Sequence, residues 1–175
     1  MELSNVFLEL KTQCRRLEAE VYPQVIKFRK TADAHGYMSN FYWSRMYIDG
    51  KSYLHVEGYY QSQKFSGINE AVAEQIRNTS NAMDTKRISQ RNPLTQQQLH
   101  EWDNGRKQAV MKRGLMCKFL SNTRLLNELL STGETVLVED SLWDSYWGCG
   151  RDGNGTNMLG KTLMEVRTIL RDTSF

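Results

Sequence analysis

The sequence predicts a single α+β domain that is mostly α-helical and has a few short strands. Two observations lead to this prediction. Most segments space their apolar residues three and four apart, which is typical of amphipathic helices, whereas only a few show the alternation or turn residues typical of strands. A length of 175 residues is ordinary for one domain with its own core.

The first part of the chain is predicted to combine one helix with short strands. Residues 2–21 carry apolar side chains on one stripe, which predicts an amphipathic helix that ends at Tyr22-Pro23. Residues 24–29 alternate as a short strand does. Asp49-Gly50 is a hairpin signal, so we expect two further short strands around it.

Helices dominate the rest of the chain. The predicted helices cover residues 57–65, 68–78, 82–90, 95–120 and 158–171, and the leucines at 125, 126, 129 and 130 mark another. Gly105 and Gly114 are expected to interrupt the long helical region, and Gly133 to close the leucine-marked helix. Residues 135–139 predict one more strand.

Composition indicates an ordinary intracellular protein. Apolar residues make up 39% of the chain and charged residues 25%, and the net charge of +3 is compatible with a phosphorylated ligand without requiring nucleic acid. Cys14, Cys117 and Cys149 are odd in number and widely spaced, so we expect neither a disulfide framework nor a zinc site. No secretory-signal pattern and no 18-residue apolar run occur, which predicts a cytoplasmic protein without a membrane partner.

Two glycine motifs follow one another near the C-terminus. Gly148, Gly150 and Gly153 form G-x-G-x-x-G, and residues 155–162 match the phosphate-binding pattern G-x-x-x-x-G-K-T. A phosphate-binding loop of that kind follows a buried strand and needs more parallel strands after its helix. Here polar and aromatic residues come first, only 13 residues follow Thr162, and no βαβ unit fits. We therefore expect neither a nucleoside triphosphatase nor a dinucleotide-binding fold.

The segment at residues 56–65 concentrates reactive side chains. If it is helical, Glu57, Tyr60, Gln61 and Lys64 lie on one face. Two interpretations stay open. The stripe is either a solvated face with Glu57 near the helix N-terminus, or a catalytic face. In the second case a carboxylate acts as acid or base beside a lysine that binds phosphate or attacks a carbon.

Aromatic residues gather at two further places. Phe41, Tyr42 and Trp43 follow small polar residues and either stack on a base or pack in the core. His35 and His55 have no partner in the sequence, so we interpret them as structural.

The second aromatic place surrounds an acid. Asp144 lies between Trp143 and Trp147, and the glycines after it let backbone amides approach a ligand. Asn157 would supply a directional amide, and the helix that starts near Met158 would favour an anion. The alternative is a mobile surface loop, against which the paired tryptophans argue.

Taken together these segments resemble the NADAR (YbiA-like) family. The matching motifs are S-N-F-Y at 39–42, I-D-G-K-S-Y at 48–53, E-x-Y-Y-Q-x-Q-K-F at 57–65, L-V-E at 137–139, D-x-Y-W-G-x-G at 144–150 and G-x-N-x-L-G-x-x-L-M-x-x-R at 155–167. The resemblance runs from about Ile26 to Arg171, so we divide the chain into an N-terminal helix (1–22) and a YbiA-like catalytic domain (23–175). It also makes the G-K-T match a coincidence.

The resemblance implies an N-glycosidase, a hydrolase that cleaves the C–N bond between a base or amine and a ribose phosphate or ADP-ribose. Lys64 would attack the anomeric carbon and form a Schiff base, with Glu57 and Asp144 as acid, base and orienting groups. The expected substrate-binding residues are Asn40, Phe41, Tyr60, Gln61, Trp102, Trp147, Gly148, Gly150, Gly155 and Asn157. The expected enzyme is metal-independent and has no cofactor.

Two substrates and two other functions remain open. ADP-ribosyl-guanine is the expected substrate, which would bring ADP-ribosylated DNA or RNA to the site, and the alternative is a phosphoribosyl aminopyrimidine intermediate of riboflavin synthesis. A catalytically silent ADP-ribose reader would need neither Glu57 nor Lys64, and a nucleic-acid-binding module would need a denser basic stripe. The chain departs from the family where Gly58 stands in place of a common histidine and Ser44-Arg45 in place of serine-proline.

Overall fold

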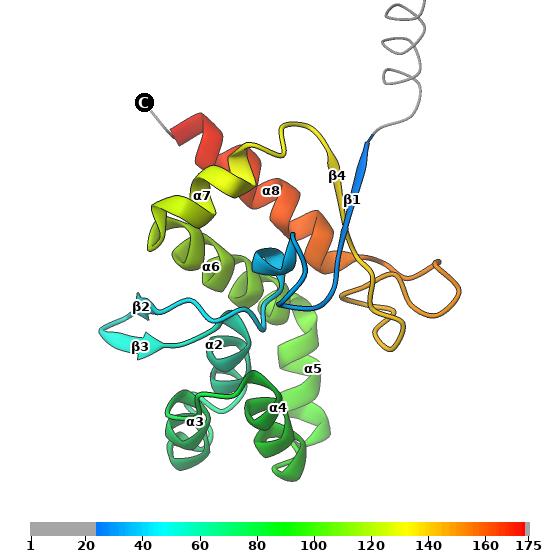
Figure 1. Cartoon of the computed structure of the whole chain (residues 1–175). Helices are drawn as coiled ribbons and strands as arrows, with labels where there is room; N and C mark the ends of the chain where they lie inside the picture. Colours follow the sequence, from blue (N-terminus) through cyan, green and yellow to red (C-terminus); the bar gives the residue numbers. More distant parts are fainter. Residues whose placement is uncertain (1–23, 174–175) are drawn as a thin grey trace, which may run out of the picture.

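The computed structural model describes residues 24–173 and has the predicted α+β class, mostly helical with a few short strands (Figure 1). The helix predicted for residues 2–21, and Cys14 within it, lie outside the described residues. In chain order the elements are β1 (Val25–Phe28), a 3-10 turn (Gly36–Met38), β2 (Met46–Ile48), β3 (Lys51–Tyr53), α2 (Val56–Gln63), α3 (Glu70–Arg77), α4 (Ala82–Arg91), α5 (Gln96–Glu101), a π-type turn (Trp102–Arg106), α6 (Lys107–Leu120), α7 (Thr123–Leu130), β4 (Val136–Glu139) and α8 (Met158–Thr173).

The strands form two separate pairs. β2 and β3 are antiparallel, and the hairpin predicted from Asp49-Gly50 is confirmed. Both turn residues have positive φ angles, 53° and 73°, as the tight turns favoured by twisted strands require. β1 and β4 pair in parallel, with Phe28 opposite Glu139. The first strand of the described chain therefore lies beside the strand that precedes α8, and β4 contacts α8 (Figure 1).

Helix boundaries follow side-chain caps. Asn69, Asn81 and Asn122 accept backbone hydrogen bonds at the starts of α3, α4 and α7. Gly105, with a φ of 84°, breaks the region between α5 and α6 as predicted. The prediction that Gly114 also interrupts it is wrong, because α6 runs through this residue without a break.

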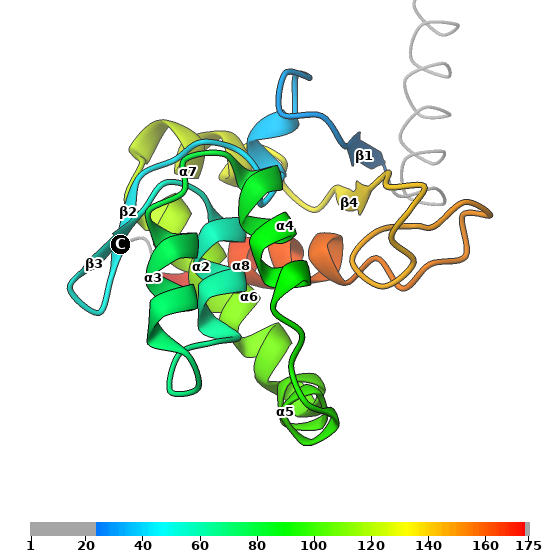
Figure 2. The ribbon, with the colours of Figure 1, turned by 90° about the horizontal axis from the view of Figure 1, so that it is seen from below.

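Gly114 instead lets two helices approach closely. A Cβ atom at this position would lie 2.9 Å from Val56 Cγ1 and 3.0 Å from Tyr59 Cδ1, both on α2. α2 therefore packs tightly on α6, and it also contacts α3 and α4, which lie beside it in Figure 2. Every residue of α2 except Gln63 is buried. A helix with a carboxylate and an amide thus lies inside the domain.

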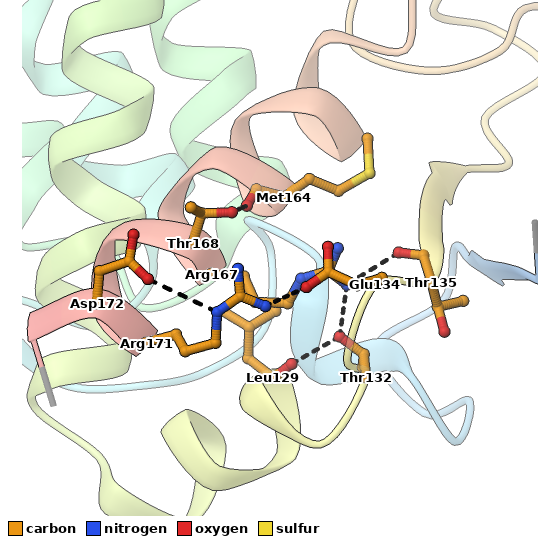
Figure 3. Close-up of polar contacts among 9 residues, drawn as sticks. All are labelled: Leu129, Thr132, Glu134, Thr135, Met164, Arg167, Thr168, Arg171 and Asp172. Atoms are coloured by element: carbon orange, nitrogen blue, oxygen red, sulfur yellow. Dashed lines mark hydrogen bonds and ion pairs between the residues drawn. The ribbon is translucent and has the colours of Figure 1, made fainter.

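α8 is fixed by its apolar face and by a buried arginine. Leu159, Leu163, Val166 and Leu170 are buried as predicted. The Arg167 Nη1 atom donates to Thr132 Oγ1 at 2.7 Å and to the Thr135 carbonyl at 2.9 Å, and Arg171 pairs with Glu134 (Figure 3). These bonds hold α8 against the connection between α7 and β4. No helix within residues 24–173 combines the length and apolarity needed to cross a membrane.

Candidate active site

A cavity of about 460 Å³ lies between α2, α4 and the loop that joins β4 to α8. Most of the predicted site residues line it, although they come from three separate segments. These are Asn40, Phe41, Glu57, Tyr60, Gln61, Lys64, Asp144 and Trp147. The fold therefore brings the predicted catalytic residues to one cavity.

Glu57 is buried and held by two side-chain amides. Asn40 Nδ2 donates to Glu57 Oε2 at 2.6 Å, and Gln61 Nε2 donates to Oε1 at 2.7 Å. Its side chain is in the interior with 3% of the residue exposed, so the interpretation of this stripe as a solvated face is wrong. Burial raises the pKa of Glu57, partly opposed by the bond from Gln61 and the charges of Lys86 and Lys64. The protonated carboxyl is therefore favoured relative to an exposed glutamate.

The segment that holds Glu57 is itself anchored from the core. The Asn40 carbonyl accepts a hydrogen bond from the Glu57 backbone N–H at 2.9 Å. Behind it, Lys118 of α6 is fully buried and its Nζ donates to the Ser39 carbonyl at 2.8 Å. Burial lowers the pKa of Lys118 to about 7. This lysine was not predicted from the sequence, because nothing in its local pattern distinguishes it from a surface lysine.

Lys64 is at the C-terminal end of α2, against two aromatic rings. Its Nζ lies 5.3 Å from the Tyr60 ring centroid and 5.9 Å from that of Trp102. The side chain is partly buried, and among residues 24–173 no carboxylate forms an ion pair with it. Burial lowers its pKa, with Glu57 opposing and Lys86 adding to the effect. A neutral, nucleophilic amine is therefore favoured more than for a lysine in water.

Asp144 shapes the loop on the opposite wall. Its Oδ1 accepts from the backbone N–H groups of Tyr146 at 3.0 Å and Trp147 at 2.7 Å. The Trp147 ring then meets the Tyr60 ring edge to face, with centroids 5.6 Å apart. One carboxylate thus folds the turn and lines the cavity, and the aromatic contact joins this loop to α2.

A model of the NADAR domain matches residues 27–171. The chain belongs to the NADAR family. It is 34% identical over 160 residues to N-glycosidase YbiA of Escherichia coli, an alignment that covers 90% of this chain and 96% of that protein. It is 36% identical over 159 residues to the riboflavin biosynthesis protein VVA0006 of Vibrio vulnificus, of which it spans 42%. The NMR structure of E. coli YbiA matches with a TM-score of 0.76, covering 86% of each chain at 36% identity.

Several predicted binding residues of this NADAR domain lie behind the cavity wall. The Asn157 side chain accepts from Glu139 N at 3.0 Å and donates to Leu137 O at 2.9 Å, so its amide holds β4 to the start of α8. A Cβ at Gly155 would lie 2.5 Å from the Cys149 backbone, and a Cβ at Gly148 would lie 2.7 Å from Ser141 Cβ. Gly150 has a φ of 70°, which suits glycine.

Trp102 is likewise behind the wall of the NADAR cavity. It is buried beneath Tyr60, with ring centroids 5.1 Å apart. Substrate contacts by Trp102, Asn157 and the three glycines remain predictions. The geometry does explain the residue types, since the glycines allow close packing and the tryptophan supports the ring beside Lys64.

The structure adds two charged residues that the predicted site did not include. Lys86 of α4 and Glu139 at the end of β4 both line the cavity. Burial raises the pKa of Glu139 to about 7, with repulsion from Asp144 and Glu57 adding to it. Glu139 could have been found from its place at the end of a predicted strand in the family motif, whereas Lys86 gives no such signal. Within the described residues, no cluster of three or more histidine, cysteine or acidic side chains could hold a metal ion.

Both described histidines of this NADAR domain that were predicted to be structural pack against neighbouring residues, and His55 explains the glycine at position 58. His55 caps α2, and its Nδ1 accepts from Gly58 N at 2.8 Å. A Cβ at position 58 would lie 2.9 Å from His55 Cε1, so the glycine leaves room for the ring. His35 packs edge to face on Tyr37. These contacts agree with the structural role predicted for both histidines.

Proposed function

We propose that this NADAR protein removes ADP-ribose from guanine through a Schiff base on Lys64. The protein is an enzyme that hydrolyses N-glycosyl bonds, and the proposal concerns its substrate and its mechanism. The observation that supports it is the opposite pKa shift of two groups in one cavity. Burial favours the protonated acid at Glu57 and the neutral amine at Lys64.

These two states are the ones that the first chemical step requires. The Lys64 Nζ lone pair attacks the anomeric carbon, the C–N bond to the base breaks, and Glu57 gives its proton to the departing nitrogen. The lysine adduct then returns a proton to Glu57, and the sugar ring opens to a Schiff base. Water adds to that carbon and expels Lys64, so the net reaction consumes one water molecule.

Asp144 and the aromatic residues have supporting roles in this proposal. The Asp144 Oδ1 atom is engaged with two backbone N–H groups, which leaves Oδ2 to orient a ribose hydroxyl. Phe41 lines the cavity and Trp143 is 78% exposed at its edge, where an aromatic face suits a purine. Gln61 holds Glu57 through its Nε2 atom, while its Oε1 is buried without a hydrogen-bond partner among the described residues.

A second candidate substrate is a phosphoribosyl aminopyrimidine. It is favoured by the relative from Vibrio vulnificus, whose name assigns it to riboflavin biosynthesis. A catalytically silent ADP-ribose-binding module would leave the buried Glu57 and the nearby Lys64 without a function, because binding alone needs neither. Contact with ADP-ribosylated DNA or RNA would follow from the proposed substrate, and this contact and the cytoplasmic location both remain predictions.

The proposal is tested by offering purified protein each substrate separately and reducing the mixture with borohydride. We expect sugar release from ADP-ribosylated guanine DNA and a reduced sugar adduct on the peptide that carries Lys64. Lys64→Ala should abolish the adduct and lower the rate at least about 100-fold. Lys161→Ala, which removes the exposed lysine of the coincidental G-K-T motif, is the matched control. Release by Lys64→Ala at the parent rate would refute the mechanism, and release only from the aminopyrimidine would refute the substrate.

A further inference from the structure

A second cavity adjoins the candidate active site. It has a volume of about 550 Å³ and lies between the segment after β1 and the first turn of α4. Phe41, Met83, Glu139 and Ser141 line both cavities, so the two spaces share a wall. Neither the resemblance nor the proposed reaction uses this second space.

The outer wall of the second cavity is basic. Arg29 and Lys30 are exposed there, and no ion pair within residues 24–173 neutralises either side chain. The N-terminus of α4 lies opposite, where the helix dipole adds partial positive charge. Glu139 is the single acidic residue that lines this space, and its raised pKa of about 7 reduces its negative charge. The electrostatic balance therefore favours an anion.

A buried histidine forms part of the inner wall. His55 is 2% exposed and lines this cavity. Its Nδ1 accepts the Gly58 N–H, so the neutral ring carries its proton on Nε2. Nε2 is enclosed, and a hydrogen bond to the Ser80 backbone opposes the lowering of the His55 pKa by burial. His55 therefore closes the inner wall and is not itself a contact for a bound anion.

Aromatic surface completes the second cavity. Phe41 lies on the shared wall, and Trp43 contributes a side chain whose residue is 61% exposed. A large exposed indole beside unpaired basic residues is typical of nucleotide recognition, in which a base stacks and a phosphate pairs with arginine.

We propose that the second cavity is a subsite for the phosphate-bearing nucleotide end of the substrate, remote from the ribose that reacts at Lys64. This inference rests on the proposed function and extends it. Arg29 and Lys30 contact the phosphate oxygens, and Trp43 stacks on the base. A dinucleotide-type ligand such as ADP-ribose is long enough to occupy both cavities, whereas ribose 5-phosphate occupies only the active site.

The test measures binding without turnover. ADP-ribose and ribose 5-phosphate are titrated into the full chain by calorimetry for the parent, for Arg29→Ala/Lys30→Ala and for Trp43→Ala. The control Lys112→Ala/Arg113→Ala removes the same charge from the exposed face of α6, where both residues pair with acids. We expect the two cavity variants to weaken ADP-ribose binding about 10- to 100-fold, and ribose 5-phosphate binding and the control to change less than about twofold.

The outcomes separate the subsite from the proposed function. ADP-ribose binding at the parent affinity in both cavity variants, or equal loss for both ligands, would overturn the subsite even if the enzyme hydrolyses ADP-ribosyl-guanine. Selective loss of ADP-ribose binding would support the subsite even if no hydrolysis of that substrate is detected. The substituted side chains are exposed, except for Lys112, which is partly buried at the surface, and none belongs to the core, so loss of folding does not complicate the comparison.

Discussion

Replacing Asn40 by alanine tests whether Glu57 is the catalytic acid. The change removes the 2.6 Å bond from Asn40 Nδ2 to Glu57 Oε2 and leaves the bond from Gln61 and the backbone bond to the Asn40 carbonyl in place. Hydrogen bonds to a charged group contribute about 1.5–3 kcal/mol. The donor stabilises the ionised carboxylate, so its loss raises the pKa of Glu57 further. At about 1.36 kcal/mol per pH unit, the expected displacement is about 1–2 pH units upward.

The measurement is kcat/KM for sugar release as a function of pH. Because the proposed acid works in its protonated form, kcat/KM falls as pH rises through the pKa of Glu57. In Asn40→Ala this alkaline limb of the pH profile should move to higher pH. Ser62→Ala is the matched control, since Ser62 is buried on the same helix and its hydroxyl donates to the Tyr59 carbonyl, away from Glu57. A limb that stays in place, or moves downward, would show that Glu57 does not supply the proton.

Two further predictions concern the packing that positions the site. The folded chain loses the Lys118 proton near pH 7, while the unfolded chain keeps it to about 10.5. The unfolding free energy of the parent should therefore rise between pH 7 and pH 10, by up to about 4 kcal/mol more than that of Lys118→Met, as measured by urea denaturation. The same dependence of the unfolding free energy on pH in both proteins would contradict this. Gly114→Val places a side chain against Val56 and Tyr59, and we expect it to lower the urea-unfolding free energy by about 1–3 kcal/mol. A variant as stable as the parent would show that the α2–α6 contact can relax.

Local elements of the fold were predictable because local chemistry determines them. The Asp49-Gly50 turn, the leucine spacing of α7 and the inward face of α8 all follow from turn propensity or helical periodicity. Gly114 shows the limit of such reasoning. A glycine inside a helix weakens it locally, yet here the close approach of α2 requires one.

The candidate site was predictable to a similar extent. Motif residues identified Glu57, Lys64 and Asp144, and the structure brings all three to one cavity. Lys86 and Lys118 were not predicted, because their positions beside the cavity and beneath Ser39 depend on how α4 and α6 pack in the fold. Both amide atoms of Asn157 bond to the backbone of β4, a structural role that no local pattern gives, while its predicted contact with substrate stays a prediction.

The sequence by itself determined the helical class, the hairpin and the family, together with the stripe of reactive residues on α2. Only the tertiary structure decided that this stripe faces a cavity between α4 and the loop after β4, while α6 packs on the other side of α2. The physical reason is that spacing along a helix determines which side chains share a face, whereas desolvation depends on what covers that face. The burial that shifts the pKa of Glu57 and Lys64 in opposite directions comes from residues far apart in the chain.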